Sequence, residues 1–151
     1  MVERLKWWWS RLNQTPLRRW IFSKILSFLI PYTGTIRPVI EDVKAGYARV
    51  RLRDGLRVRN HLKSIHALAL ANLGELTTGL ALHFAMSNRQ RAILTRLEVE
   101  YLRKARGVVY AQAQIESQTI PTGLIVVKAS IRDDTAAVVA TVCAHWLVDE
   151  R

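Results

Sequence analysis

Glu75 is the residue of this chain whose setting best suits chemistry. Its neighbours Leu73 and Leu76 are apolar, and it lies inside a long run of apolar residues. Burying a carboxylate without a partner costs free energy, so Glu75 must be neutral, ion-paired or facing a polar cleft. Carboxylates in such settings gather at functional sites. We therefore expect Glu75 to be catalytic or to face a ligand; the alternative is a structural pair with a buried arginine.

A second group of polar residues, Asn60, His61 and His66, precedes the same apolar run. If a helix begins near His66, its first backbone N–H groups have no partner within the helix and attract negative charge. The N–H groups around His66 and Ala67 could therefore hold an oxyanion.

Helix geometry separates these two groups within one chain. Glu75 follows His66 by nine residues, which corresponds to a rotation of about 900° and a rise of about 13.5 Å. Two chains whose helices lie side by side and antiparallel could bring Glu75 of one to the helix start of the other. The spacing therefore predicts a dimer whose sites draw residues from both chains.

The apolar run from 64 to about 84 predicts one long helix. Its residues are apolar nearly all the way round, which is typical of a helix buried on most sides. A sheet curling around a single helix would bury it in this way. Gly74 and Gly79 each cost about 1 kcal/mol of helix propensity, and close approach of another element would explain their presence.

Alternating apolar residues predict strands before and after this helix. Two segments, 36–46 and 47–53, meet at Gly46, and four later segments are expected to form a meander. The fold class is therefore α+β, with an antiparallel sheet wrapped around one long central helix. The later segments are 93–102, 108–117, 124–133 and 136–148.

The first 33 residues predict a basic, amphipathic helical arm, followed by one domain over 34–151. Thr15 and Pro16 are typical of the cap and first turn of a helix. The arm carries six basic residues against one acidic residue. Such an arm either packs on the domain or a partner subunit, or lies on an anionic membrane. Its apolar stripes are Leu5, Trp8, Trp9 and Leu12, then Leu17, Trp20, Ile21, Ile25, Phe28 and Leu29.

The composition excludes several classes of protein. The 151 residues carry a net charge of +11, which favours an anionic partner. The single cysteine, Cys143, excludes an intrachain disulfide and a multi-cysteine zinc site, and its apolar neighbours predict an inert core thiol. His83 and His145 lack metal-ligand spacing. We expect no metal, and a cytoplasmic protein whose arm is a candidate membrane contact.

The segment NHLKSIHALALANLGELTTGLAL (60–82) resembles the motif of hotdog-fold acyl-CoA thioesterases, in particular the phenylacetyl-CoA thioesterase-like branch. In that motif an asparagine is followed six residues later by His-Gly-Gly, and an Asp or Glu follows the histidine by nine residues. Asn60, His66 and Glu75 match these spacings. The likeness covers residues 36–148, and the arm is similar to that of bacterial hotdog proteins of unassigned function.

This resemblance implies hydrolysis of a fatty or aromatic acyl-CoA thioester by a hotdog dimer or a pair of dimers, with no cofactor beyond the coenzyme A of the substrate. Glu75 would activate water or attack the thioester itself, and the Ala67 N–H would polarise the thioester carbonyl. Asn60 would orient the water or the carbonyl, and His66 would shape the mouth of the helix. Ala67 and Leu68 replace the glycine pair, so the Leu68 side chain would narrow the space for substrate.

Six basic residues near the motif are candidates for holding the phosphates of coenzyme A, because arginine grips phosphates through forked hydrogen bonds. A solvated surface charge is the alternative for each one. They are Arg57, Arg59, Lys63, Arg103, Lys104 and Arg106.

Other functions fit the same fold. Loss of the glycine pair would suit a protein that binds acyl-CoA or an acyl carrier without turnover. His61 and Glu75 are 14 residues apart, which resembles the spacing in the fold's hydratases and dehydratases, although their Gly-Pro turn is missing. Nucleic acid is not an expected partner, because no recognised binding motif accompanies the alternating arginines.

Overall fold

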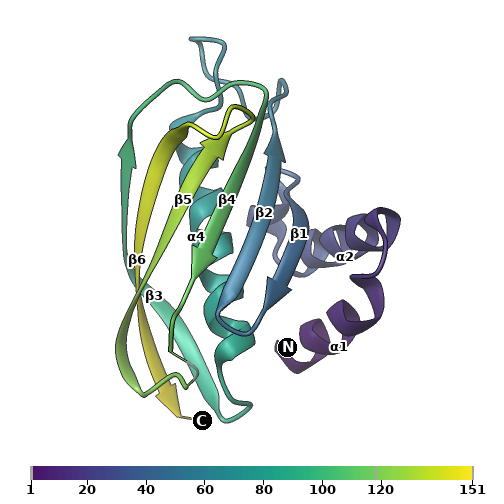
Figure 1. Ribbon diagram of the computed structural model, residues 1–151, viewed down its shortest axis with the longest axis vertical. Helices are drawn as coiled ribbons and strands as arrows, with labels where there is room; N and C mark the ends of the chain where they lie inside the picture. Colours follow the sequence, from purple (N-terminus) through teal and green to yellow (C-terminus); the bar gives the residue numbers. More distant parts are fainter. Residues whose placement is uncertain (1, 118, 151) are drawn as a thin grey trace.

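The computed structural model describes residues 2–117 and 119–150, which form a sheet curled around one helix with a helical arm beside it (Figure 1). The predicted antiparallel sheet, central helix and N-terminal helical arm are therefore confirmed. The helices are α1 (Val2–Leu12), α2 (Pro16–Leu29), α3 (Pro31–Gly34) and α4 (Ala67–Ala85). The strands are β1 (Val39–Lys44), β2 (Tyr47–Arg53), β3 (Gln90–Tyr101), β4 (Val108–Gln114), β5 (Gly123–Asp133) and β6 (Val138–Glu150).

The strands form one antiparallel sheet in the order β1-β2-β4-β5-β6-β3. The predicted meander holds for β4, β5 and β6 but is wrong for β3, which pairs with β6 instead of β4. After β3 the chain crosses over to β4 (Figure 1), and the N–H groups of Leu102 and Arg103 donate to the Val139 carbonyl. Alternation along a strand reveals the strand but not its neighbours, so the crossover has no signature in the pattern.

α4 begins at Ala67, three residues later than predicted, because Ile65 still pairs with Arg59 as an isolated bridge. Beyond that point the prediction of a helix buried on most sides is confirmed. The buried residues cover successive positions around the helix: Ala69, Leu70, Leu73, Gly74, Leu76, Thr77, Thr78, Gly79, Leu80, Ala81 and Leu82.

Both glycines of α4 lie where β6 approaches the helix closely. A Cβ on Gly74 would collide with the side chain of Val142, and one on Gly79 would lie 3.2 Å from the Trp146 ring. The expected close approach is therefore confirmed at both positions.

The arm packs on the domain, which is one of the two predicted alternatives. The Oγ of Ser23 accepts a hydrogen bond from the Ile40 N–H of β1 at 2.8 Å, and Lys6 Nζ donates to the Met86 carbonyl at 2.8 Å. α3 spans the predicted boundary between residues 33 and 34. The arm contributes four apolar side chains to the core: Leu5, Trp9, Phe22 and Leu26.

The packing face of α2 differs from the predicted stripe. α2 starts at Pro16 as predicted, and the Thr15 hydroxyl caps it. Leu17, Ile21 and Phe28 of the predicted stripe, however, face solvent. Two opposite faces of α2 each carry apolar residues at a spacing of three or four. The periodicity of the sequence therefore could not tell which face packs on the domain. Among residues 2–117 and 119–150, no helix is long and apolar enough to cross a membrane.

Candidate active site

Glu75 lines a cavity of about 270 Å³ that lies between the arm, α4 and the start of β3. Most of the cavity wall is apolar, and the arm supplies Leu5, Leu26 and Ile30 to it. Burial raises the pKa of the Glu75 carboxyl above its ordinary value, because an apolar surrounding disfavours the charged form.

No basic side chain in the described part of the chain pairs with Glu75. Arg91 also lines the cavity, but its guanidinium is 3.0 Å from the Asp149 carboxylate. Among the described residues, Glu75 therefore does not form the structural ion pair with an arginine that was the alternative prediction. The Trp146 side chain lines the same cavity, and its buried indole N–H has no hydrogen-bond partner among the described residues. An oxygen of water or of a ligand would satisfy that donor.

His66 caps α4, because its Nδ1 accepts a hydrogen bond from the Leu68 N–H at 3.1 Å. The Ala67 N–H, in contrast, donates no hydrogen bond to any acceptor within residues 2–117 and 119–150. The Ala67 carbonyl accepts from the Tyr101 hydroxyl at 3.0 Å. Leu68 is 65% exposed and lines neither the Glu75 cavity nor the groove that Ala67 lines. A free N–H at a positive helix end is therefore available to a ligand oxygen.

Asn60 organises the loop before α4. Its Oδ1 accepts hydrogen bonds from the Leu62 N–H at 2.9 Å, the Ser64 N–H at 3.2 Å and the Ser64 hydroxyl at 3.1 Å. The spacing of Asn60 therefore has a structural reason beside the predicted contact with water or substrate. Asn60 and Ala67 nevertheless line one groove, of about 310 Å³, together with Tyr101.

The six predicted phosphate-binding residues fall into separate places. Arg103 and Lys104 line the groove at the helix start. A neighbouring groove of about 540 Å³ holds Arg59, Lys63 and Arg106, although Arg59 is 2.8 Å from the Asp54 carboxylate. Arg57 is exposed and lines neither groove. Five of the six are thus gathered around the start of α4.

The cavity of Glu75 and the groove of Ala67 are distinct, and no residue lines both. This separation agrees with the helix arithmetic that places Glu75 and His66 half a turn out of phase. Within one chain the two groups do not form a single site.

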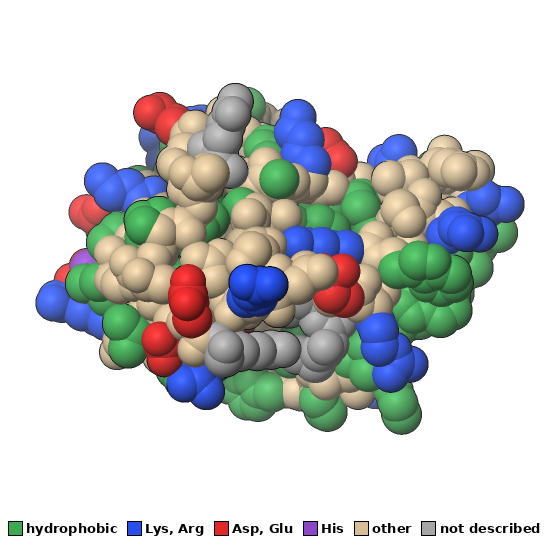
Figure 2. Space-filling model, turned by 90° about the horizontal axis from the view of Figure 1, so that it is seen from below, with side chains coloured by type: hydrophobic (Ala, Val, Ile, Leu, Met, Phe, Trp, Pro, Cys, Tyr) green, Lys and Arg blue, Asp and Glu red, His purple; other side chains and the backbone are tan. Residues whose placement is uncertain are grey.

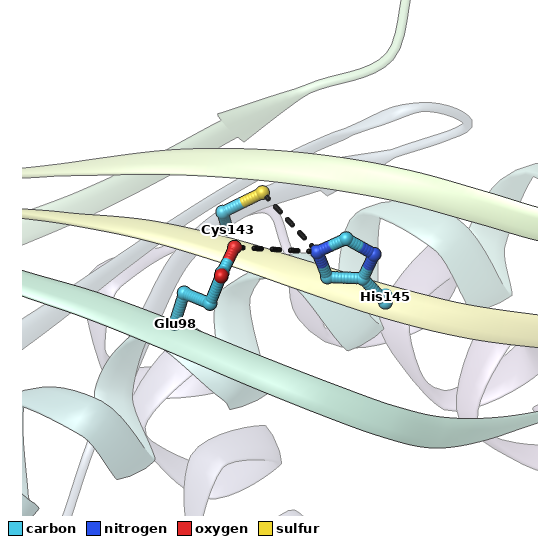
Figure 3. A group of neighbouring side chains, drawn as sticks. All are labelled: Glu98, Cys143 and His145. Atoms are coloured by element: carbon cyan, nitrogen blue, oxygen red, sulfur yellow. Dashed lines mark hydrogen bonds and ion pairs between the residues drawn. The ribbon is translucent and has the colours of Figure 1, made fainter.

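One polar group went unnoticed in the sequence. Glu98, Cys143 and His145 meet on the outer face of the sheet (Figure 3). Cys143 is only partly buried and faces away from α4, so the prediction of a core thiol is wrong. Alternate residues of a strand share a face, and the Cys-x-His spacing was the signal that could have found this group.

The geometry of this group suits a cation better than a nucleophilic relay. His145 Nε2 lies 3.8 Å from Cys143 Sγ and 3.4 Å from Glu98 Oε2. One nitrogen therefore faces both partners, whereas a triad needs its two ring nitrogens for two different partners. Converging sulfur, nitrogen and oxygen donors are ligands that zinc accepts. Arg96 already pairs with Glu98, so a metal ion would have to displace Arg96, and the group forms a polar network on the surface of the sheet.

Several solved structures share the fold of this chain over most of its length. The protein named genomics APC5556 is 29% identical, with 97% of this chain and 98% of that chain covered and a TM-score of 0.85. PA5026 from Pseudomonas aeruginosa, a protein of unknown function named a probable thioesterase, is 20% identical, with 83% and 91% covered and a TM-score of 0.76. A phenylacetic acid degradation-related protein from Ralstonia eutropha JMP134 is 19% identical, with 78% and 89% covered and a TM-score of 0.68.

None of the curated proteins compared with the chain matches it. Residues 18–148 match the family described as Domain of unknown function (DUF4442). The predicted hotdog fold of thioesterase-family proteins is thereby confirmed, and the chain belongs to the DUF4442 family.

Proposed function

We propose that this protein is an acyl-CoA thioesterase that works as a homodimer. The observation that carries the proposal is Glu75, a carboxylate with a raised pKa in the wall of a largely apolar cavity and with no basic partner among the described residues. A general base needs a pKa closer to neutrality than that of an exposed carboxylate, and an apolar cavity suits an acyl chain. PA5026, which has the same fold, is named a probable thioesterase.

The exposed edge of β3 supports the homodimer. Among the described strands β3 pairs only with β6, and a long unpaired edge is a template for another strand. A second copy placed antiparallel, with the two-fold axis between Thr95 and Arg96, sets Arg91 opposite Glu100 of the second copy. The same register sets Leu94 opposite Leu97 of the second copy. β3 is therefore complementary to itself in charge and in apolar side chains.

This register also completes the site. Gln90 lines the Glu75 cavity, and the two-fold axis places it opposite Tyr101 of the second copy. Tyr101 holds the carbonyl of Ala67 in its own chain. The Ala67 N–H of one copy thus comes toward Glu75 of the other, as the helix arithmetic requires.

The chemistry follows from these positions. The acyl chain enters the Glu75 cavity, and the thioester oxygen accepts a hydrogen bond from the Ala67 N–H of the other copy, which stabilises the developing oxyanion. Glu75 takes a proton from water as the water oxygen bonds to the thioester carbon. The C–S bond then breaks, and the departing thiolate takes the proton from Glu75, leaving a carboxylic acid and coenzyme A. Direct attack by Glu75, with a mixed anhydride hydrolysed afterwards, uses the same residues.

The basic residues around the helix start are assigned to the diphosphate and 3′-phosphate of coenzyme A. Arg103 and Lys104 lie in the same groove as Ala67, with Arg59, Lys63 and Arg106 next to it. A cytoplasmic location belongs to the proposal as well, because the single cysteine suits a reducing compartment.

Binding without turnover is the second candidate. It is favoured by the Ala67 and Leu68 side chains, which stand where the resembling thioesterases have glycines. In that case the same two surfaces would hold acyl-CoA or an acyl carrier but release no thiol.

Release of free thiol from short, medium, long and aromatic acyl-CoAs tests the proposal. Glu75→Gln should lower turnover by about 10²–10⁴-fold, the usual contribution of a general base. Glu116→Gln is the matched control, because this exposed carboxylate lies outside β3 and outside the wall of the Glu75 cavity. Wild-type turnover by Glu75→Gln would overturn the mechanism. Thiol release from none of the substrates, with acyl-CoA raising the thermal stability, would establish binding without turnover.

A further inference from the structure

α2 has a second apolar face that the domain does not cover. Phe22 and Leu26 on its inner face are 0% and 1% exposed. On the opposite face Leu17 is 67% exposed, Ile21 37% and Phe28 84%. Leu17, Ile21 and Phe28 are four and seven residues apart, so they lie on one side of the helix. Single exposed apolar residues are ordinary, but a continuous stripe calls for a partner.

The arm also exposes tryptophans together with basic side chains. Trp7 and Trp20 are 52% and 49% exposed. Arg11 lies over the Trp7 ring and Lys24 over the Trp20 ring, each 5.2 Å from the ring centroid. Hydrophobic and basic side chains lie next to one another on the arm, at the right of Figure 2. Residues 1–33 contain six basic residues and one acidic residue.

We infer that the outer face of the arm docks on an anionic lipid bilayer. Tryptophan favours the boundary between headgroups and acyl chains, where its ring is apolar and its N–H is hydrated. Lysine and arginine at the edge of an apolar helix face attract anionic headgroups. The arm therefore matches this surface in both hydrophobicity and charge. The inference does not rest on the proposed hydrolysis.

The arm would lie in the plane of the membrane surface. α2 has 14 residues, which is too few for a span of about 20. Its inner face stays fixed to the domain through the bond from the Ile40 N–H to Ser23 and through buried Phe22 and Leu26. The outer stripe is consequently presented by a folded surface, and docking requires no unfolding of the arm.

A second copy is a less suitable occupant of this surface. α2 packs against β1, whereas β1 and β3 are opposite edges of the sheet. In Figure 1 the arm lies on the β1 side. The proposed dimer uses the edge of β3, whereas the outer stripe of α2 lies opposite the face that packs on the domain. The positive charge around the stripe would also repel the same surface of another copy.

Flotation of the full-length protein with lipid vesicles tests this inference. Wild type should float with phosphatidylcholine–phosphatidylglycerol vesicles at low salt and much less with phosphatidylcholine alone, and added salt should weaken binding. Tryptophan emission should shift to shorter wavelength as Trp7 and Trp20 leave water. The double variant Ile21→Gln, Phe28→Gln should bind at least tenfold more weakly, because it removes the apolar contact.

Leu124→Gln is the matched control, since Leu124 is 59% exposed on β5, away from the arm, and its variant should float like wild type. Equal circular dichroism spectra establish that the variants are folded. No flotation of wild type with anionic vesicles at low salt would overturn the inference. So would unchanged binding of the double variant, or a fall in its oligomer size without lipid, which would identify another copy as the occupant.

Discussion

The two ends of the α4 site face very different surroundings. At the start of the helix, the Ala67 N–H lies in an open groove with Arg103 and Lys104. About two turns later, Glu75 lies in a largely apolar cavity closed by the arm. The first setting suits phosphates and an oxyanion, and the second suits an acyl chain and a base with a raised pKa.

The difference gives a reason for the proposed dimer, in which one helix serves both purposes. A single groove rich in positive charge would stabilise the ionised form of Glu75 and lower its pKa. Keeping the carboxylate some 13.5 Å away along the helix preserves its apolar setting. In the proposed dimer, a second copy brings its Ala67 N–H to the substrate, while the cations of its groove hold the phosphates of coenzyme A.

The largest expected effect comes from disabling each end in a different copy. Glu75→Gln removes the base, and Ala67→Pro removes only the N–H of the first helical residue. Proline suits that position, and His66 already has the extended backbone (φ −64°, ψ 142°) that a following proline requires. Loss of one oxyanion donor should cost about 10²–10³-fold. Heterodimers of the two variants contain one intact composite site, so they should regain about half of the wild-type turnover.

Co-expression with two different affinity tags isolates these heterodimers, and thiol release measures their turnover. Homodimers of each variant, carried through the same purification, are the controls. If both ends acted within one chain, no intact site would form, and heterodimers as inactive as the parents would refute the composite site.

The next effect concerns stability and pH. Because burial raises the pKa of Glu75 in the folded protein, the folded state holds this proton to a higher pH than the unfolded state. The free energy of unfolding therefore falls as pH rises from the unfolded pKa through the folded one. Each pH unit between the two pKa values is worth about 1.4 kcal/mol. Glu75→Gln should remove this loss and be more stable than wild type at neutral pH, but not below the unfolded pKa.

Urea unfolding of both proteins at acidic and neutral pH measures this difference. Glu98→Gln is the control and should show no such gain, because a hydrogen bond from His145 and the charge of Arg96 lower the pKa of Glu98. An equal difference in the free energy of unfolding at both pH values would mean that burial does not raise the pKa of Glu75. The electrostatic contrast between the Glu75 cavity and the groove at the start of α4 would then be smaller than proposed.

α4 was the most predictable element of this fold, because its pattern of apolar residues fits only a buried helix. Residues apolar on all sides require burial on all sides, and Gly74 required a close neighbour, which is Val142. α2 was ambiguous for the opposite reason, since both of its faces are apolar. The position of β3 in the sheet was not predictable. Its alternating residues indicate a strand but do not indicate that its neighbour is β6.

For the candidate site, the sequence predicted which residues belong to it but not the contacts that they make. The positions of Asn60, His66 and Glu75 can be read from the sequence, whereas the use of the Asn60 oxygen in its own loop depends on backbone geometry. The arm's part in the wall of the Glu75 cavity could not be predicted either, because it depends on contacts between distant segments. Ile30 and Glu75, for example, meet around one cavity although 45 residues separate them.

That wall gives the smallest expected effect, a change in substrate preference. Ile30 is partly buried at the end of α2 and lines the cavity. Ile30→Ala should deepen the cavity and shift the ratio of kcat/KM toward longer acyl chains by about tenfold, as expected for the space of one or two methylene groups in an apolar pocket. Leu29→Ala on the same helix is the matched control, because Leu29 is 42% exposed and outside the cavity wall. Measuring kcat/KM over a series of chain lengths decides the matter. An equal loss at every length would show that the arm supports the fold without contacting the acyl chain, and the contrast between the two ends of α4 would then rest on Glu75 alone.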